Sequence, residues 1–296
     1  MHLLSISDLT KKEIEELMQA AKILKSNPHQ NDDRLKNKTL AMLFEKPSTR
    51  TRISFEVAMV QLGGHAINLN ANEIQLKRGE AVSDTAKVLE RYVDGVMARV
   101  YSHDTLTELS KNSKIPVING LSDIEHPCQI ISDLFTIYEK FGNFNIKLAY
   151  VGDGNNVCNS LMLGCAIMGI TVAVATPKGY EPDKAITNAA KKISNKIKIT
   201  NDPAEAVKDA DVIYTDVWIS MGDESEEEER LKKFKKYRVN EKLMSSAKPN
   251  CKIMHCLPAH RGMEITDVID KANSIVWDQA ENRLHAQKAI LLKLLD

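Results

Sequence analysis

The densest group of potentially reactive side chains is the segment PSTRTR, residues 47–52. Ser48 or Thr49 can cap a helix that begins near Arg52, because hydroxyls accept hydrogen bonds from the free N–H groups of a helix start. A helix N-terminus also carries partial positive charge and binds phosphate, and the arginines add charge-assisted donors. The segment lacks the lysine pattern of a P-loop. Capping alone does not require arginine at both Arg50 and Arg52, so we predict a phosphate site.

Further polar groups stand at the ends of other predicted strands. They are Arg99 and the segments 123–129, 152–156, 215–222 and 255–262. In parallel α/β sheets, ligands bind beyond the carboxyl ends of the strands. Packing alone does not explain so many polar groups on one edge, so we predict a composite site in a cleft between two domains.

The segment GDGNN, residues 152–156, is similar to the start of a dinucleotide-binding fingerprint. The third glycine of that fingerprint would fall at Val157, and the following strand ends without a carboxylate to bind a ribose. These differences argue against NAD. We still expect the turn to place Asn155 or Asn156 in the cleft.

A metal site or a Cys–His nucleophile pair is an alternative reading of two segments. The candidate side chains are His126, Cys128, His255, Cys256 and His260. Their spacing matches no standard metal site, and a single histidine in such a segment is by default a core residue. Metal therefore remains a minor alternative.

Length and composition limit the class of protein. The chain has 296 residues and 33.1 kDa, which suggests two domains. Apolar residues make up 43% and charged residues 27%, as in globular proteins. Lys and Arg together number 40, as do Asp and Glu, so no overall positive field attracts nucleic acid or anionic lipid. We expect neither as a partner.

The cysteines and the N-terminus favour a cytoplasmic protein. The 5 cysteines form no C-x-x-C pair, which argues against a disulfide framework and fits a reducing compartment. The first residues contain no apolar core of signal-peptide length. Residues 154–177 carry no charge, but Gly169 divides them, so we expect a buried helix followed by a buried strand rather than a membrane span.

Short β-rich runs alternate with helical patterns along the chain. Strands are predicted at residues 39–44, 65–69, 95–100, 116–118, 147–151, 171–175, 211–215, 252–255 and 274–277. Helices are predicted at residues 10–25, 52–62, 81–92, 128–140, 157–168, 183–194 and 282–295, with another beginning in the acidic run 224–229. Buried strands that alternate with helices indicate an α/β fold with two doubly wound domains, each with a mostly parallel sheet. Residues 140–145 are the expected joint between them.

Several of these motifs together resemble one protein family. Residues 48–52, the following ISFE (53–56) and HPCQ (126–129) resemble the carbamoyl-phosphate half of the aspartate/ornithine carbamoyltransferases. DVWISMG (216–222) and HCLP (255–258) resemble the ornithine-specific branch of that family. Aspartate-specific members lack Ser-Met-Gly and carry proline at the position of Cys256. The resemblance extends over the whole chain.

This resemblance implies a fold, a reaction and an assembly. Residues 1–140 would bind carbamoyl phosphate, completed by the C-terminal helix 282–296, and residues 141–281 would bind ornithine. The active site would lie in the cleft between these domains. The carbamoyl group would pass to the δ-amine of L-ornithine, giving L-citrulline and phosphate in arginine biosynthesis. The family forms homotrimers, or multiples of trimers, and requires no metal and no organic cofactor.

The resemblance also implies which residues bind each substrate. Carbamoyl phosphate would be bound by Ser48, Thr49, Arg50, Thr51, Gln75, Arg99, His126, Gln129, Cys256, Leu257 and Arg283. Ornithine would be bound by Asn156, Asp216, Ser220 and Met221. The residues expected to act in the reaction itself are Arg50, Arg99, His126, Asp216 and Cys256.

Gln75 lies in the long connection formed by residues 70–81. This connection exceeds the usual length of about 2–6 residues, and long ordered loops at strand ends are often functional. The alternative is a flexible surface loop. In the family, this glutamine reaches the carbamoyl-phosphate site of the neighbouring subunit.

Two alternatives to ornithine transfer remain open from the residues. The amine could be aspartate, putrescine or an acetylated ornithine, because a few side chains decide this choice. Alternatively, the chain is a non-catalytic anion-binding protein on the same fold. The presence of both substrate motifs argues against the second alternative.

Overall fold

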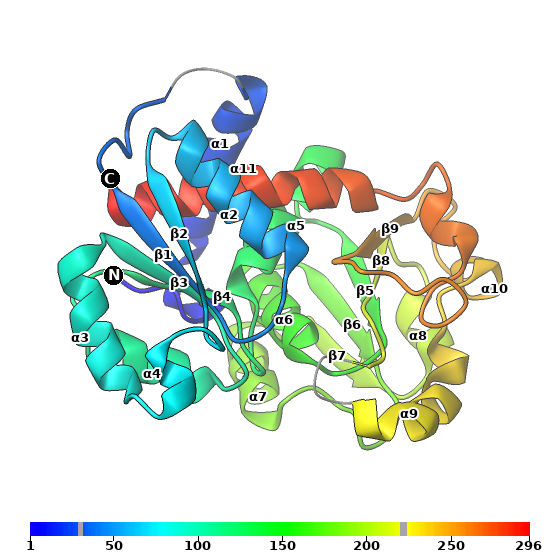
Figure 1. Ribbon diagram of the computed structural model, residues 1–296. Coiled ribbons are helices and arrows are strands. Elements are labelled where there is room, and N and C mark those ends of the chain that lie inside the picture. Colours follow the sequence, from blue (N-terminus) through cyan, green and yellow to red (C-terminus); the bar gives the residue numbers. More distant parts are fainter. Residues whose placement is uncertain (29–31, 220–223) are drawn as a thin grey trace. The chain divides into compact units, whose positions relative to one another are not determined.

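The computed structural model describes residues 1–28, 32–219 and 224–296 (Figure 1). The chain divides into two compact units, each built on its own parallel sheet. Unit 1 contains Met1–Phe135 and Asn282–Asp296, and unit 2 contains Thr136–Glu281. The predicted α/β fold with two parallel sheets is confirmed.

The sheet of unit 1 has four strands in the order β2-β1-β3-β4. The strands are β1 (Thr39–Phe44), β2 (His65–Asn70), β3 (Gly95–Arg99) and β4 (Val117–Leu121). Every pair is parallel, so all four carboxyl ends lie at one edge of the sheet. The central strands β1 and β3 are almost entirely buried, as their continuous apolar sequences require, whereas the edge strand β2 is largely exposed.

Helices cover both faces of this sheet. Those lying wholly in unit 1 are α1 (Lys11–Ser26), α2 (Thr49–Gln61), α3 (Val82–Tyr92) and α4 (His103–Lys111). Ala86 of α3 and Leu106 of α4 pack in one buried cluster with Leu43 of β1, and Figure 1 shows the two helices on the same side. On the other face, Leu295 of α11 (Val276–Leu295) reaches Gly95 at the start of β3.

The sheet of unit 2 has five strands in the order β7-β6-β5-β8-β9, again all parallel. The strands are β5 (Lys147–Val151), β6 (Thr171–Ala175), β7 (Ile197–Thr200), β8 (Val212–Thr215) and β9 (Lys252–His255). The helices are α6 (Asn156–Met168), α7 (Lys184–Ile193), α8 (Pro203–Val207), α9 (Glu227–Phe234) and α10 (Glu241–Met244). The boundary between the units falls within α11 and within α5 (Pro127–Phe141).

The uncharged segment 154–177 forms a buried helix and a buried strand, as expected. Nearly all of α6 is buried, Gly169 ends it in the left-handed conformation (φ 76°), and β6 follows directly. Within the described part of the chain, no helix combines the length and apolarity that crossing a membrane requires.

Some predicted elements were wrong or missing. Residues 274–277 do not form a strand, because Ser274 makes only an isolated bridge and α11 begins at Val276. Strand β7 was missed because Lys198 interrupts its short apolar pattern. Helix α2 begins at Thr49, earlier than predicted, because Ser48 caps it.

Close packing requires a glycine at position 154. A Cβ atom at this position would lie 2.3 Å from the backbone nitrogen of Pro182 and 2.6 Å from the carbonyl oxygen of Tyr180. The Gly154 N–H also donates to that same oxygen at 3.0 Å. The second glycine of GDGNN therefore permits contact with another turn of unit 2.

We predict that Gly154→Ala lowers the free energy of unfolding by about 2–3 kcal/mol or prevents folding, because the overlap involves backbone atoms that cannot move independently. Urea unfolding of both proteins measures this loss. Gly179→Ala is the control: Gly179 has φ 91° but open space around it, so only the cost of about 1–2 kcal/mol for the left-handed conformation applies. Equal effects of the two substitutions would contradict the packing argument.

Candidate active site

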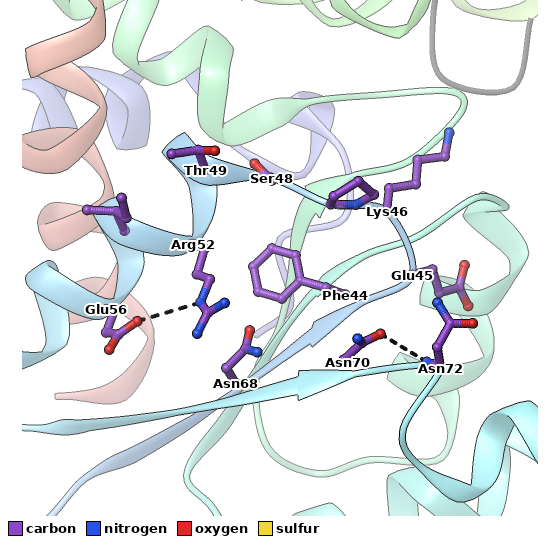
Figure 2. Close-up of a pocket in the computed structure, with 12 residues that line it drawn as sticks. Phe44, Glu45, Lys46, Ser48, Thr49, Arg52, Glu56, Asn68, Asn70 and Asn72 are labelled. Atoms are coloured by element: carbon purple, nitrogen blue, oxygen red, sulfur yellow. Dashed lines mark hydrogen bonds and ion pairs between the residues drawn. The ribbon is translucent and has the colours of Figure 1, made fainter. Parts of the chain in front are cut away.

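The start of α2, in unit 1, is where the sequence predicts an anion site. Ser48 is the N-cap, and its Oγ accepts a hydrogen bond from the Thr51 N–H at 3.2 Å. The first N–H groups of a helix have no intrahelical acceptor, so they remain available to an anion. Figure 2 shows Ser48 and Thr49 at this helix start, with Lys46 just before them.

Hydrogen bonds at the strand ends place the backbone of Arg99 beside the end of β1, a few residues before this helix start. The Glu45 N–H, after β1, donates to the Arg99 carbonyl oxygen at 2.9 Å. The Tyr101 N–H, after β3, donates to Glu45 Oε2 at 2.7 Å. Lys46 Nζ lies 4.6 Å from the centre of the Tyr101 ring. These contacts hold the ends of β1 and β3 together.

His126 lies within the field of three arginines. It is buried at the start of α5, and burial lowers its pKa well below the ordinary histidine value. The positive charges of Arg283, Arg99 and Arg50 lower that pKa further. The imidazole is therefore neutral at pH 7 and carries one N–H, so it can donate a hydrogen bond without adding positive charge.

Buried hydrogen bonds orient Arg283 in unit 1. Its Nη1 donates to Gln129 Oε1 at 2.6 Å, and its Nη2 donates to Thr51 Oγ1 at 3.1 Å. Gln129 Nε2 in turn donates to Asp133 Oδ1 at 2.8 Å, which fixes the amide with its oxygen toward Arg283. Four residues from α2, α5 and α11 thus form one connected group.

Cys128 is not a candidate nucleophile. It is fully buried, and its Sγ donates to the Asn119 carbonyl oxygen at 3.3 Å. Burial raises the pKa of the Cys128 thiol to about 12, so hardly any reactive thiolate exists at neutral pH. The Cys–His alternative at residues 126–128 therefore has no support.

A surface cavity of about 770 Å³ adjoins the same helix start. Arg52 and Glu56 of α2 line it, together with Asn68 of β2. Figure 2 shows Arg52 directed toward Asn68 and paired with Glu56, at 3.9 Å between Nε and Oε2. Arg52 therefore faces this cavity, whereas Arg50 acts on His126.

The connection that contains Gln75 is anchored at apolar positions. Ile74 and Leu76 pack against the buried cluster beneath α3 and α4, whereas Gln75 itself is exposed in a short 3₁₀ helix, Gln75–Arg78. Gln75 is therefore an exposed polar residue on a segment that Ile74 and Leu76 anchor to unit 1.

Asp216 is the central polar residue of unit 2. It follows β8, is 5% exposed and accepts three hydrogen bonds. The donors are Cys256 Sγ at 2.9 Å, Asn155 Nδ2 at 2.8 Å and the Val217 N–H at 2.8 Å. No cation is among these donors, so an incoming ammonium group would meet a carboxylate that only neutral groups stabilise.

Asn155 occupies the backbone N–H groups that a dinucleotide site at GDGNN would use. Its side chain caps α6 by accepting the N–H groups of Val157 and Cys158, both at 3.1 Å. These amides are the ones that would bind a pyrophosphate. Asn156 is the first residue of α6 and is half-buried.

Among the described residues, the potential metal ligands that converge are Asp216, His255 and Cys256, with ligand atoms within 4.8 Å of one another. His126, Cys128 and His260 are not part of this group. Both ring nitrogens of His255 already make polar contacts: Nδ1 accepts from the Leu257 N–H at 2.9 Å, and Nε2 lies 3.2 Å from Glu264 Oε1. A metal would have to displace one of these contacts.

Arg230 bonds to residues on both sides of the segment 220–223. Its Nη1 donates to Asp153 Oδ2 at 2.9 Å and to the Trp218 carbonyl oxygen at 3.1 Å. Its Nε donates to Glu226 Oε2 at 3.0 Å, and the guanidinium lies 4.9 Å from the centre of the Tyr180 ring. Residues before and after 220–223 are therefore tied to the GDGNN turn.

Sequence reasoning placed most of these groups but missed some. Ser220 and Met221, expected to bind ornithine, lie outside the described residues. Asp133 was missed, although its spacing of four from Gln129 on a helix was a usable signal. Arg230 was missed because it stands in a charged run that reads as a solvated helix start.

Two family models match the chain. The carbamoyl-P binding domain of aspartate/ornithine carbamoyltransferase matches residues 1–139, and the Asp/Orn binding domain matches residues 144–294. The chain belongs to the aspartate/ornithine carbamoyltransferase family. The second match continues through most of α11, although Asn282–Asp296 pack with unit 1.

Similar members of this carbamoyltransferase family come from archaea. "Ornithine carbamoyltransferase" of Archaeoglobus fulgidus is 57% identical over 298 residues, covering 99% of this chain and 97% of that protein. "Ornithine carbamoyltransferase, catabolic" of Thermoplasma acidophilum is 53% identical over 299 residues, covering 99% and 98%. The solved structure of the Pyrococcus furiosus ornithine carbamoyltransferase has a TM-score of 0.96 at 54% identity, covering 99% of this chain and 96% of that one.

We predict that iodoacetamide at pH 8 labels Cys256 of this carbamoyltransferase and leaves Cys128 unlabelled. Cys256 is partly exposed, whereas the Cys128 thiol, with a pKa of about 12, is roughly 1 part in 10⁴ thiolate at that pH. Peptide mass spectrometry after brief labelling identifies the site, and Cys256→Ser is the control. Labelling of Cys128 in the folded protein, or an unlabelled Cys256, would contradict this assignment.

Proposed function

We propose that this protein transfers the carbamoyl group of carbamoyl phosphate to the δ-amine of L-ornithine, giving L-citrulline and phosphate. The observation that carries the proposal is the start of α2, where Arg283 donates to Thr51 and Gln129, together with the buried His126, whose pKa is lowered by burial and by the charges of Arg283, Arg99 and Arg50. Such a site suits a small dianion whose neighbouring carbonyl must accept a hydrogen bond.

The first half of the chemistry belongs to unit 1. The amine attacks the carbamoyl carbon, the carbonyl oxygen becomes an oxyanion, and the bond to the phosphate oxygen then breaks. The α2 start, Arg50 and Arg99 hold the phosphate and stabilise its charge as it leaves. His126, Thr51 and Arg283 offer donors to the developing oxyanion. The Gln129 carbonyl, which has a second lone pair, can accept from the carbamoyl NH₂.

The second half of the chemistry is preparation of the amine. The δ-amine resembles a lysine side chain, so its deprotonation at pH 7 costs about 4 kcal/mol. Asp216 attracts the ammonium group. The thiol of Cys256, which donates a hydrogen bond to Asp216, lies beside this carboxylate. Holding the amine at the carbamoyl carbon can offset roughly 7–11 kcal/mol of the barrier.

The full assignment of residues is part of the proposal. Carbamoyl phosphate is bound by Ser48, Thr49, Arg50, Thr51, Gln75, Arg99, His126, Gln129, Cys256, Leu257 and Arg283; ornithine is bound by Asn156, Asp216, Ser220 and Met221. Residues 1–140 with 282–296 form the carbamoyl-phosphate domain, and residues 141–281 form the ornithine domain. The chemistry needs no metal or organic cofactor, because arginine and helix N–H groups supply the electrophilic assistance.

We place the reaction in arginine biosynthesis and in the cytoplasm. Transfer from a mixed anhydride to an amine forms a stable urea, which favours citrulline formation. The Thermoplasma acidophilum relative is named catabolic, so measuring the forward and reverse rates tests the direction. All 5 cysteines are free thiols, which suits a reducing compartment.

We also propose that a homotrimer is the active form, with Gln75 completing the site of a neighbouring subunit. Unit 1 presents apolar side chains beside an unpaired sheet edge: Ile53 and Val60 of α2, and Ile67 of β2, are all exposed. Ile53 also lines the cavity next to the phosphate-binding helix start. Apolar surface next to an open edge favours association with another chain.

The decisive test of the reaction is an amine panel. The protein is mixed with carbamoyl phosphate and either ornithine, aspartate, putrescine or acetylornithine, and ureido product is measured with and without EDTA. We expect ornithine to be preferred by at least about 100-fold, because a polar site strongly rejects analogues that lack its partner groups. EDTA should have no effect. Preference for another amine would change the substrate, and absence of any product would favour an anion-binding protein.

Complementation tests the shared site. Arg50→Ala should lose about 10²–10³ in kcat, because one preorganised donor to the transferred group is removed. Gln75→Ala should also be nearly inactive. When the two variants are dissociated, mixed equally and reassembled, activity should return to about a quarter of wild type, since each site draws its two chains independently. Each variant carried through the same treatment alone is the control. If the mixture stays inactive, or Gln75→Ala alone is active, the shared site is wrong.

A further inference from the structure

His255 ends β9, directly before the proposed site residue Cys256. The residue is 1% exposed, and its backbone N–H donates to Gln279 Oε1 at 2.9 Å. Because Nδ1 accepts the Leu257 N–H, that nitrogen carries no hydrogen, so the hydrogen lies on Nε2. Nε2 then donates to Glu264 Oε1 at 3.2 Å. The hydrogen bonds of unit 2 thus select one tautomer of this ring.

The bond from Leu257 to His255 closes a tight turn around Cys256. Leu257 has φ 60°, a left-handed conformation that a leucine rarely adopts. A side-chain acceptor two residues before the N–H is the arrangement that asparagine provides in Asx turns. His255 plays that part here, and the residue enclosed by the turn, Cys256, directs its Sγ to Asp216 at 2.9 Å.

Glu264 holds the far side of the imidazole. Its side chain is 0% exposed, and its Oε1 also accepts the His260 N–H. Its backbone carbonyl oxygen accepts the Val239 N–H at 2.8 Å. Glu264 therefore holds His255 and His260 through its carboxylate and is itself bonded to Val239 through its backbone.

We propose that His255, anchored by Glu264, is the positioning residue that shapes the turn at Cys256 and Leu257 for carbamoyl transfer. This role rests on the proposed function. His255 itself contacts no substrate in this account: its two ring nitrogens hold the Leu257 backbone and the Glu264 carboxylate. It therefore acts through the geometry of its neighbours and is neither an acid, a base nor a metal ligand.

Two substitutions separate the functions of the ring nitrogens. His255→Asn keeps an acceptor for the Leu257 N–H, because the asparagine oxygen takes the place of Nδ1, but it loses the link to Glu264. His255→Gln keeps a donor near Nε2 for Glu264 but removes the local acceptor. We expect His255→Gln to lose about 10²-fold in kcat, the typical cost of a small misplacement, whereas His255→Asn loses less than about tenfold.

Three further measurements distinguish positioning from a structural role. The inhibition constant for inorganic phosphate should be unchanged in both variants, because the phosphate site lies in unit 1. The melting temperature should fall by only about 2–4 °C, as for one net hydrogen bond. The rate at which iodoacetamide labels Cys256 should rise in His255→Gln but not in His255→Asn. This rate requires no turnover, so it tests the turn even if the proposed function fails.

Two other variants complete the test. Glu264→Gln should remain nearly fully active, because its amide oxygen can accept both hydrogen bonds; a 100-fold loss would mean that charge is needed and would overturn the positioning role. His260→Gln, in the same loop with a largely exposed side chain, is the matched control and should behave as wild type. Equal losses in His255→Gln and His255→Asn, the reverse order, or wild-type activity and labelling in both would overturn the proposal.

Discussion

Positive charge around the buried His126 is the constraint on which the first unit depends, since Arg99 and Arg283 are buried and Arg50 is partly exposed. Burial lowers the pKa of this histidine, and the positive charges of Arg283, Arg99 and Arg50 lower it further. Guanidiniums of like charge also repel one another. Hydrogen bonds from Arg283 to Thr51 and Gln129 keep this arrangement fixed without ligand. A bound dianion would relieve this repulsion, so residues that bind a phosphate here would in turn be stabilised by it.

The second unit has the opposite charge pattern. Asp216 is a buried carboxylate surrounded by neutral donors from an amide, a thiol and a backbone N–H. Such donors stabilise the anion and still leave its charge uncompensated. One unit is therefore prepared for an anion and the other for a cation. This division fits a reaction between a phosphorylated carbamoyl group and an amino acid whose side chain is an ammonium ion.

Local sequence patterns predicted single helices and strands but not the contacts between them. The run Thr39–Phe44 is apolar throughout, so β1 was predicted with its observed bounds. Ser274–Trp277 also reads as β-branched and aromatic, but tertiary packing uses Val276 to begin a helix. The contact between Gln129 and Arg283 could not be predicted from local patterns, because the two residues stand 154 positions apart. Motifs thus indicated candidate site residues, and only the fold shows which of them are in contact.

Both sheets contain a strand followed by a capped helix, but the two N-caps leave different groups available. Ser48 is short and takes only the Thr51 amide, so the start of α2 remains open to a phosphate. Asn155 is longer, takes the two amides of Val157 and Cys158, and turns its remaining N–H group toward Asp216. The N-cap side chain thereby leaves one helix start open to an anion, whereas at the other it supports a carboxylate. A glycine-rich turn alone could not have indicated this difference.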